Sequence, residues 1–147
     1  MIRRFLALAL VNVTACLAFF GLCSTVDAQQ PASPRRIGVL LVGWSCDQKE
    51  VHALHEGLRD AGYVEGHDVV IECRSAGGDF NQIPPLTAGL VQSKVDVIVA
   101  DSTPTALAAK RATSAIPIVM TLAGDPIRSG LVVSLAHPGG NVTAFQQ

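Results

Sequence analysis

The sequence is poor in aromatic residues, in charge and in metal-ligand spacings. Of its 147 residues, 5% are aromatic and 16% are charged, and the formal net charge is −1. Because it has no basic stripe, we expect neither nucleic acid nor an anionic membrane surface as a partner. Its four histidines and four cysteines form no CxxC, HxxxH or comparable spacing, so we expect no metal site and no cofactor. There is also no internal repeat.

The first 28 residues have the composition of a secretory signal peptide. Two arginines precede an apolar run that Asn12 and Thr14 interrupt, and residues 26–28 have the small-x-small form of a cleavage site. We therefore expect export to the periplasm, cleavage after Ala28 and no stable membrane insertion afterwards. Two alternatives stay open. The apolar run is about long enough for a membrane anchor, and Val13 to Cys16 resembles a lipoprotein box.

After a flexible lead-in at residues 29–34, the chain alternates strands and helices. The apolar runs that predict strands lie at residues 37–42, 69–73, 95–100, 116–120 and 141–143. Short alternating units of this kind are typical of the α/β class, with a doubly wound parallel sheet and right-handed crossovers. We expect the strand order 2-1-3-4-5 in one lobe that spans residues 35–147.

The helices between these strands carry capping signals. A capping box, formed by Ser45 with Gln48 or by Asp47 with Glu50, is expected before the first helix. The caps expected for the later helices are Asn81, Thr103 and Asp125. The last of these helices should run from about Pro126 to Ala136 and pack Leu131 and Leu135 on the sheet.

Polar side chains and helix starts follow the first, third and fourth strands. In open parallel sheets, ligands bind at the carboxyl ends of the strands, near the point where the strand order reverses. Trp44 and Ser45 lie there, where the indole can cover the apolar part of a ligand or pack on another lobe. Ser102 and Thr103 begin a helix that could bind a carboxylate. Asp125 could accept from a ligand ammonium or cap its helix. The loops expected to touch a small molecule are 44–46, 102–103 and 122–125.

Several sequence blocks occur in a recognisable order. Residues 57–66 contain a GYVEG motif, residues 137–143 contain PGGNVT, and residues 95–100, 116–119 and 124–126 lie between them. Their order and spacing resemble a bacterial family of ABC transporter substrate-binding proteins. The resemblance implies a periplasmic protein that is not an enzyme, with two α/β lobes joined by a hinge. It implies an amino-acid-like ligand clamped between the lobes and an ABC transporter permease as partner.

The resemblance covers only the first lobe of that family. We therefore expect the second lobe to be absent and this form to bind weakly, with a non-functional fragment as the alternative. A cysteine-dependent enzyme is a competing hypothesis, with Cys46 as nucleophile and His52 or His55 as base. His52 is expected about a turn and a half along the helix and His55 on another face, and both positions argue against this hypothesis. The effector lobe of a cytoplasmic repressor shares the fold, but the leader occupies the place of its DNA-binding segment.

Two cysteines remain after cleavage, Cys46 and Cys73, because Cys16 and Cys23 belong to the leader. An even pair in an oxidising compartment favours a disulfide. In the expected strand order, strands one and two are neighbours about 4.8 Å apart, so both thiols emerge at one edge of the sheet. We expect the bond between Cys46 and Cys73, with two separate buried thiols as the alternative.

Overall fold

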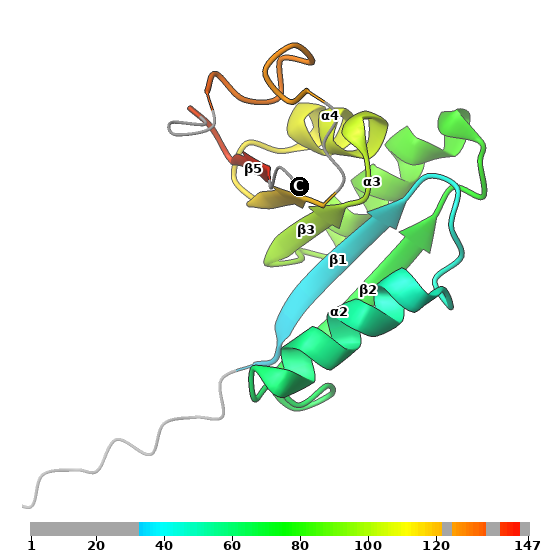
Figure 1. Cartoon of the computed structure of the whole chain (residues 1–147), viewed down its shortest axis with the longest axis vertical. Helices are drawn as coiled ribbons and strands as arrows, with labels where there is room; N and C mark the ends of the chain where they lie inside the picture. The colour runs from blue at the N-terminus through cyan, green and yellow to red at the C-terminus, as the bar shows by residue number, and fades with distance from the viewer. Residues whose placement is uncertain (1–32, 122–124, 135–138, 145–147) are drawn as a thin grey trace, which may run out of the picture. The chain divides into compact units, whose positions relative to one another are not determined.

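The computed structural model describes residues 33–121, 125–134 and 139–144 (Figure 1). The elements in these residues are β1 (Arg35–Leu41), α2 (Lys49–Asp60), β2 (Val69–Ser75), the 3-10 turn η1 (Phe80–Gln82), α3 (Ile83–Gln92), β3 (Val97–Ala100), α4 (Thr103–Ala112), β4 (Ile118–Met120) and β5 (Val142–Ala144). The predicted signal peptide and its cleavage site lie outside the described residues. Within the described residues, no helix is long and apolar enough to span a membrane.

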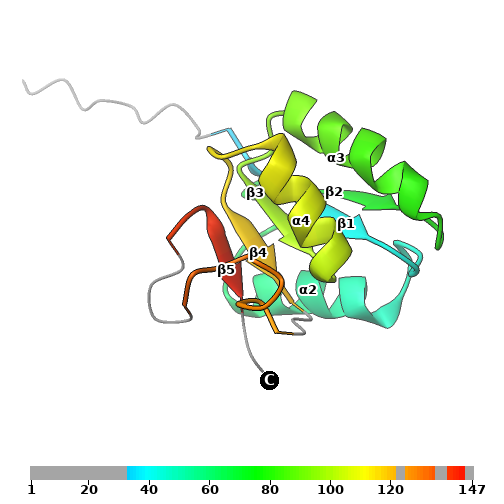
Figure 2. The same cartoon turned by 90° about the horizontal axis from the view of Figure 1, so that it is seen from above.

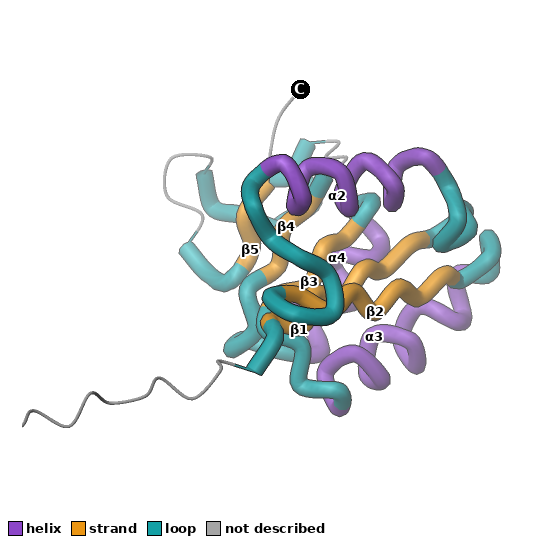
Figure 3. Tube along the Cα trace, turned by 90° about the horizontal axis from the view of Figure 1, so that it is seen from below, coloured by secondary structure: helices purple, strands orange, loops and turns teal. Residues whose placement is uncertain are grey.

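The five strands form one parallel sheet in the order β2-β1-β3-β4-β5, which confirms the predicted topology. Helix α2 covers one face of the sheet, and α3 and α4 cover the other (Figures 2 and 3). Strand β1 is central because the chain crosses first to β2 on one side and then to β3 on the other. The carboxyl ends of β1 and β3 therefore lie next to each other at the point where the order reverses.

Alternate residues of β1 belong to two separate hydrophobic cores, because successive side chains of a strand point to opposite faces of the sheet. Val39 and Leu41 face α2 and pack with Val51 of that helix. Leu40 belongs to the core under α3 and α4, which also contains Leu90. Both faces of β1 are thus covered from residue 37 onward, which explains why residues 37–41 have no polar side chain.

Asp96 joins the amino ends of β1 and β3. Its carboxylate accepts a hydrogen bond from the Arg36 backbone N–H at 2.7 Å and one from the Arg35 guanidinium at 3.3 Å. The Arg36 N–H is the largest cause that holds the pKa of Asp96 below the ordinary aspartate value, and the Arg35 side chain adds to it against a smaller effect of desolvation. The ionised form is therefore favoured by folding.

This lowered pKa predicts a loss of stability in acid. A folded-state pKa below the unfolded value contributes stability above the unfolded pKa, and the contribution is lost as the pH falls through the folded value. We expect Asp96→Asn to reduce the dependence of the urea midpoint on pH below about pH 4. The exposed Asp60→Asn serves as the matched control. Identical pH profiles for wild type and Asp96→Asn would contradict the prediction.

The predicted caps of the first and second helices are wrong. The residue before α2 is Gln48, whose side chain makes no capping bond, while Ser45 Oγ accepts from the Asp47 N–H at 3.3 Å. Before η1, Asp79 Oδ1 accepts from the Asn81 N–H at 2.9 Å, so Asn81 receives the cap instead of providing it. In both loops a polar side chain close in sequence accepts from a backbone N–H in place of the predicted cap. The local sequence pattern does not determine which side chain does so.

Helix α4 begins one residue earlier than its predicted cap requires. Ser102 is the N-cap and Thr103 is the first helical residue, with Pro104 next. The Ser102 N–H donates to Thr105 Oγ1 at 3.1 Å. The correction moves the capping role from Thr103 to its neighbour, because Thr105 lies three residues after Ser102, as a capping box requires.

The helix predicted from about Pro126 to Ala136 is absent over residues 126–134, where the chain makes a single turn. Asp125 Oδ1 does cap this turn, since it accepts from the N–H groups of Ile127 and Arg128 at 3.1 and 3.0 Å. Gly130 has φ +71° and ends it, with Leu131 N–H bonded to Pro126 O at 3.0 Å. Leu131 is buried in the core as predicted. Leu135 lies outside the described residues.

Candidate functional site

Asp101 connects the loops that follow β1 and β3. Its Oδ2 accepts from the Val42 N–H at 2.9 Å, and its Oδ1 accepts from the Ser102 hydroxyl at 2.8 Å. The hydroxyl of Thr105 lies 3.0 Å from the same Oδ1 and 2.8 Å from Ser102 O, so its single proton serves one acceptor at a time. Asp101 is only 8% exposed. A buried carboxylate with donors on both oxygens fixes these two loops relative to each other.

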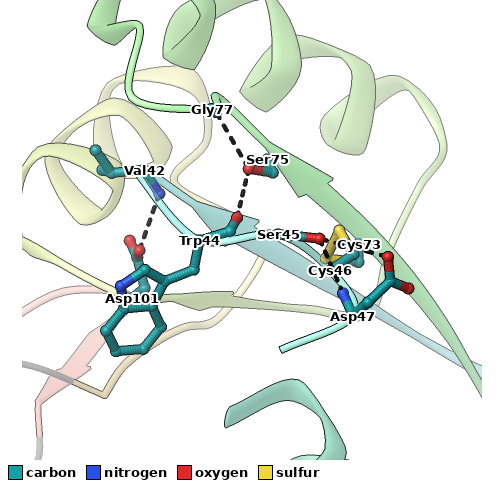
Figure 4. Close-up of a disulfide and its surroundings, with 9 residues drawn as sticks. All are labelled: Val42, Trp44, Ser45, Cys46, Asp47, Cys73, Ser75, Gly77 and Asp101. Atoms are coloured by element: carbon teal, nitrogen blue, oxygen red, sulfur yellow. Dashed lines mark hydrogen bonds between the residues drawn. A yellow bond between two sulfur atoms is a disulfide. The ribbon is translucent and has the colours of Figure 1, made fainter. Parts of the chain in front are cut away.

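The loop after β1 is also tied to β2. Cys46 and Cys73 form a disulfide, as predicted, with their Cα atoms 5.9 Å apart (Figure 4). Two residues earlier in the loop, the Trp44 carbonyl accepts from Ser75 Oγ, which in turn accepts from the Gly77 N–H at 3.1 Å. The indole of Trp44 extends away from the disulfide, toward Asp101 (Figure 4).

A crevice of about 90 Å³ lies between this loop, α2 and the carboxyl ends of the strands. Its polar lining comes from Glu50, Asp101 and Thr121, and Trp44 covers one side with 36% of its surface exposed. The remaining lining residues are apolar and are Val39, Leu41, Val51, Leu54 and Val99. An apolar crevice with a few polar groups is the usual form of a small-molecule site.

Glu50 contributes a carboxylate to this crevice. Its Oε2 is buried and has no hydrogen-bond partner among the residues that the structure describes. The Glu50 side chain as a whole is 34% exposed, and its Oε1 lies 4.0 Å from Lys49 Nζ. Its Oε2 is therefore an acceptor that a bound group could use. The sequence pattern predicts only a capping role for Glu50 and does not single out Asp101 or Thr121 as site residues. An acidic residue directly after a buried parallel strand was the signal for Asp101.

The structure does not gather all the predicted site residues around the crevice. Trp44 lines it, and Ser102 is connected to it through Asp101. Thr103 instead lines a groove of about 380 Å³ between α3 and α4. Ser45 is exposed and bonds to Asp47, while Asp125 caps its turn. Residues 122–124 of the third predicted loop lie outside the described residues.

A larger hollow of about 420 Å³ lies beside α2 at the start of β2, lined in part by His52, His55 and Tyr63. It is far from the carboxyl ends of the strands, and His55 Nδ1 is engaged by Glu65 Oε2 at 2.8 Å. We assign the site to the smaller crevice, because only there do loops from several strands converge on polar groups. Within the described residues, no cluster of three potential metal ligands exists.

The predicted nucleophile has no free thiol in this structure. Cys46 is in the disulfide, and a disulfide sulfur is not a thiolate. His52 and His55 contact each other, with ring centroids 6.4 Å apart, and both line the distant hollow. The geometry therefore gives no support to the cysteine-dependent enzyme.

The family model described as ABC transporter substrate binding protein matches residues 37–147. The chain belongs to this family. The match covers the whole described lobe from β1 onward, including the loops that form the crevice. Proteins of the substrate-binding family are typically exported and are not typically enzymes.

Relatives of this family member include the tyrosine-binding protein of Clostridioides difficile, which is 43% identical over 88 residues. That match covers 60% of this chain and 26% of the relative. A solved Streptococcus pneumonia domain in complex with L-Trp is 32% identical, with a TM-score of 0.69 over 76% of this chain and 38% of that chain. A ligand-free, open substrate binding protein with adhesive properties from Clostridium difficile is 32% identical, with a TM-score of 0.66 over 75% and 38%.

These solved relatives share the α/β fold of the lobe described above. The chain spans about a quarter of the curated relative and less than two fifths of each solved relative. The similarity therefore concerns only the part of each relative that matches this chain.

Proposed function

We propose that this protein is a substrate-binding component of an ABC uptake transporter, exported by its first 28 residues and cleaved after Ala28. Its partners are then a small amino-acid-like ligand and a transporter permease. The observation that carries the proposal is the crevice at the carboxyl edge of the sheet, where Trp44, Glu50 and Asp101 meet. Membership of the substrate-binding family supports the same role.

The chemistry of the crevice favours an aromatic amino acid. The relatives include a protein named for tyrosine and one solved with L-Trp. In this chain, the indole of Trp44 can pack on an aromatic ring, a contact that favours offset or edge-to-face geometry. The buried Oε2 of Glu50 has the charge to accept from the ligand ammonium. Ser102, at the start of α4, is the nearest of the predicted candidates for the carboxylate.

The roles first predicted for Ser45, Thr103 and Asp125 are secondary in this proposal. Ser45 and Thr103 remain candidates for a ligand that extends beyond the crevice, since Ser45 lies in a loop and Thr103 begins α4 at the same edge of the sheet. Asp125 contributes by capping the turn that follows β4.

The crevice is too small to enclose an amino acid by itself. Ligand pockets have volumes of about 300 to 1,000 Å³, whereas this one has about 90 Å³. The proposal therefore makes it one half of a site that a second lobe completes, as in proteins that close on a hinge. Binding by this chain is then expected to be weak.

We expect calorimetry with a panel of amino acids to show L-tyrosine and L-tryptophan binding with a Kd near 1 mM, about −4 kcal/mol. Trp44→Ala should weaken this binding about tenfold or more, because the aromatic contact is lost. Val133→Ala is the matched control, since Val133 is 77% exposed and lies outside the crevice. Nanomolar binding, or equal binding by the Trp44→Ala variant, would contradict the proposal.

A further inference from the structure

Two cross-links, spaced two residues apart, hold the loop after β1 against the end of β2. One is the hydrogen bond from Ser75 Oγ to the Trp44 carbonyl, and the other is the Cys46–Cys73 disulfide. Residue 44 of the loop pairs with residue 75 of β2, and residue 46 pairs with residue 73, so the residue numbers run in opposite directions. The loop therefore runs antiparallel to the end of β2 (Figure 4). Cys73 and Ser75 lie on the same face of their strand, as residues two apart do.

Cys46 also packs against the hydrophobic core on the α2 side of the sheet. The hydrogen bonds that remain hold the loop mainly to itself. Residues 43 to 45 are exposed, and a Cβ on Gly43 would meet no atom within 4 Å. The Asp47 N–H donates to Ser45 Oγ, and the Gln48 N–H donates to Ser45 O. These bonds stay within the loop and do not tie it to the sheet. At its start, the loop is anchored by Val42, which bonds to Asp101 and to the Gly78 N–H.

The position of Trp44 thus depends on the segments on either side of it. Val42 fixes the backbone before the indole, and the disulfide at Cys46 fixes it afterwards. A single attachment would leave the second half of the loop free to rotate, whereas two attachments on opposite sides of Trp44 define its direction. Loops with few buried contacts open at low free energy, so the covalent link is the attachment that decides the position of this one.

We propose that the Cys46–Cys73 disulfide positions the ligand crevice by holding Trp44 in place, so that reducing it weakens ligand binding while the lobe stays folded. This inference rests on the proposed function, because it takes Trp44 as a ligand contact. The apparent affinity falls in proportion to the fraction of molecules in which Trp44 is held at the crevice.

The redox step is a thiol–disulfide exchange. A dithiol reductant supplies two electrons and two protons, which convert the S–S bond into two S–H groups, while the dithiol becomes a cyclic disulfide. No other bond of the protein changes. The Ser75 hydrogen bond remains possible after reduction, so the loop is loosened at one of its two cross-links.

The experiment uses Trp44 as its own probe, since it is the only tryptophan of the chain. Tryptophan fluorescence and its quenching by acrylamide are compared in the oxidised wild type, the dithiol-reduced wild type and the double variant Cys46→Ser/Cys73→Ser. Leu90→Ala is the matched control, because Leu90 of α3 is fully buried in the core on the face of the sheet opposite α2. It destabilises the lobe without touching the loop. Binding of L-tyrosine is measured by calorimetry on the same four samples, and folding by circular dichroism.

We expect reduction or the double variant to raise the quenching constant about twofold and to weaken L-tyrosine binding about tenfold, as a loop that must be ordered on binding costs affinity. The Leu90→Ala control should change neither. Equal quenching in oxidised and reduced protein, or the same change in Leu90→Ala, would overturn the proposal. Loss of the circular dichroism signal in both the reduced protein and the double variant would also overturn it, because the bond would then hold the fold.

If the proposed function is wrong, the binding and quenching measurements give a different combination of results. If the oxidised wild type does not bind L-tyrosine or L-tryptophan, the ligand assignment is wrong. A quenching change confined to the reduced protein and the double variant would still support the positioning of Trp44 by the disulfide.

Discussion

Replacing Asp101 with alanine is expected to lower the free energy of unfolding by about 3 to 5 kcal/mol, because hydrogen bonds to a charged acceptor are each worth roughly 1.5 to 3 kcal/mol. The substitution leaves the Val42 N–H without its acceptor and removes the carboxylate that receives the Ser102 hydroxyl. It also separates the loop after β1 from the loop after β3. Urea denaturation measures the loss, and the chemical shift of the Val42 amide reports the local change.

Two control variants test this assignment. Ser102→Ala removes one of the two donors and leaves the Val42 bond in place, so it should cost about half as much, roughly 1.5 to 3 kcal/mol. Asp47→Ala removes an exposed carboxylate from the same loop and should be nearly neutral. If Asp101→Ala were no more destabilising than Asp47→Ala, Asp101 would not be the residue that joins the two loops.

Removing the disulfide is expected to lower the free energy of unfolding by roughly 3 to 4 kcal/mol, because the bond restricts the unfolded chain between its two cysteines. The sequence separation of Cys46 and Cys73 is 27 residues. Urea denaturation of the Cys46→Ser/Cys73→Ser variant measures this loss. Chemical reduction of the wild type should give a loss of similar size.

Mass spectrometry of the non-reduced protein provides the control for this prediction. Formation of the bond removes two hydrogen atoms, so reduction should raise the mass by about 2 Da. Two free thiols in protein recovered from the periplasm would show that the bond does not form there. A reduced protein as stable as the oxidised one would show that the bond contributes no stability.

The architecture of the lobe could be predicted from the sequence, because it depends on patterns that are local and repeated. A strand that is buried on both faces is apolar without interruption, as residues 37–42 are. Alternation with helices then leaves a parallel sheet with right-handed crossovers as the expected arrangement. The strand order placed Cys46, just past the end of strand one, beside Cys73 of the neighbouring strand two, so the cysteine pair also followed from the sequence.

Helix boundaries and the length of the last helix were predicted less well. A cap depends on which polar side chain accepts from a given N–H. Asp79, Ser102 and Thr105 take part in caps where another residue was expected. Pro126 to Gly130 form one turn because Gly130 adopts a positive φ and closes it. A glycine in that position is compatible with either a helix or its end, so the pattern does not distinguish them.

By itself, the sequence determined the fold class, the strand order and the pair of cysteines that bond. Only the tertiary structure decided which side chains meet at the candidate site. It placed Trp44, Glu50 and Asp101 around one crevice and directed Thr103 into a different groove. Hydrophobic burial is set by periodicity along the chain. A binding site, in contrast, depends on the directions of a few side chains from distant segments, which are set by packing and by single hydrogen bonds.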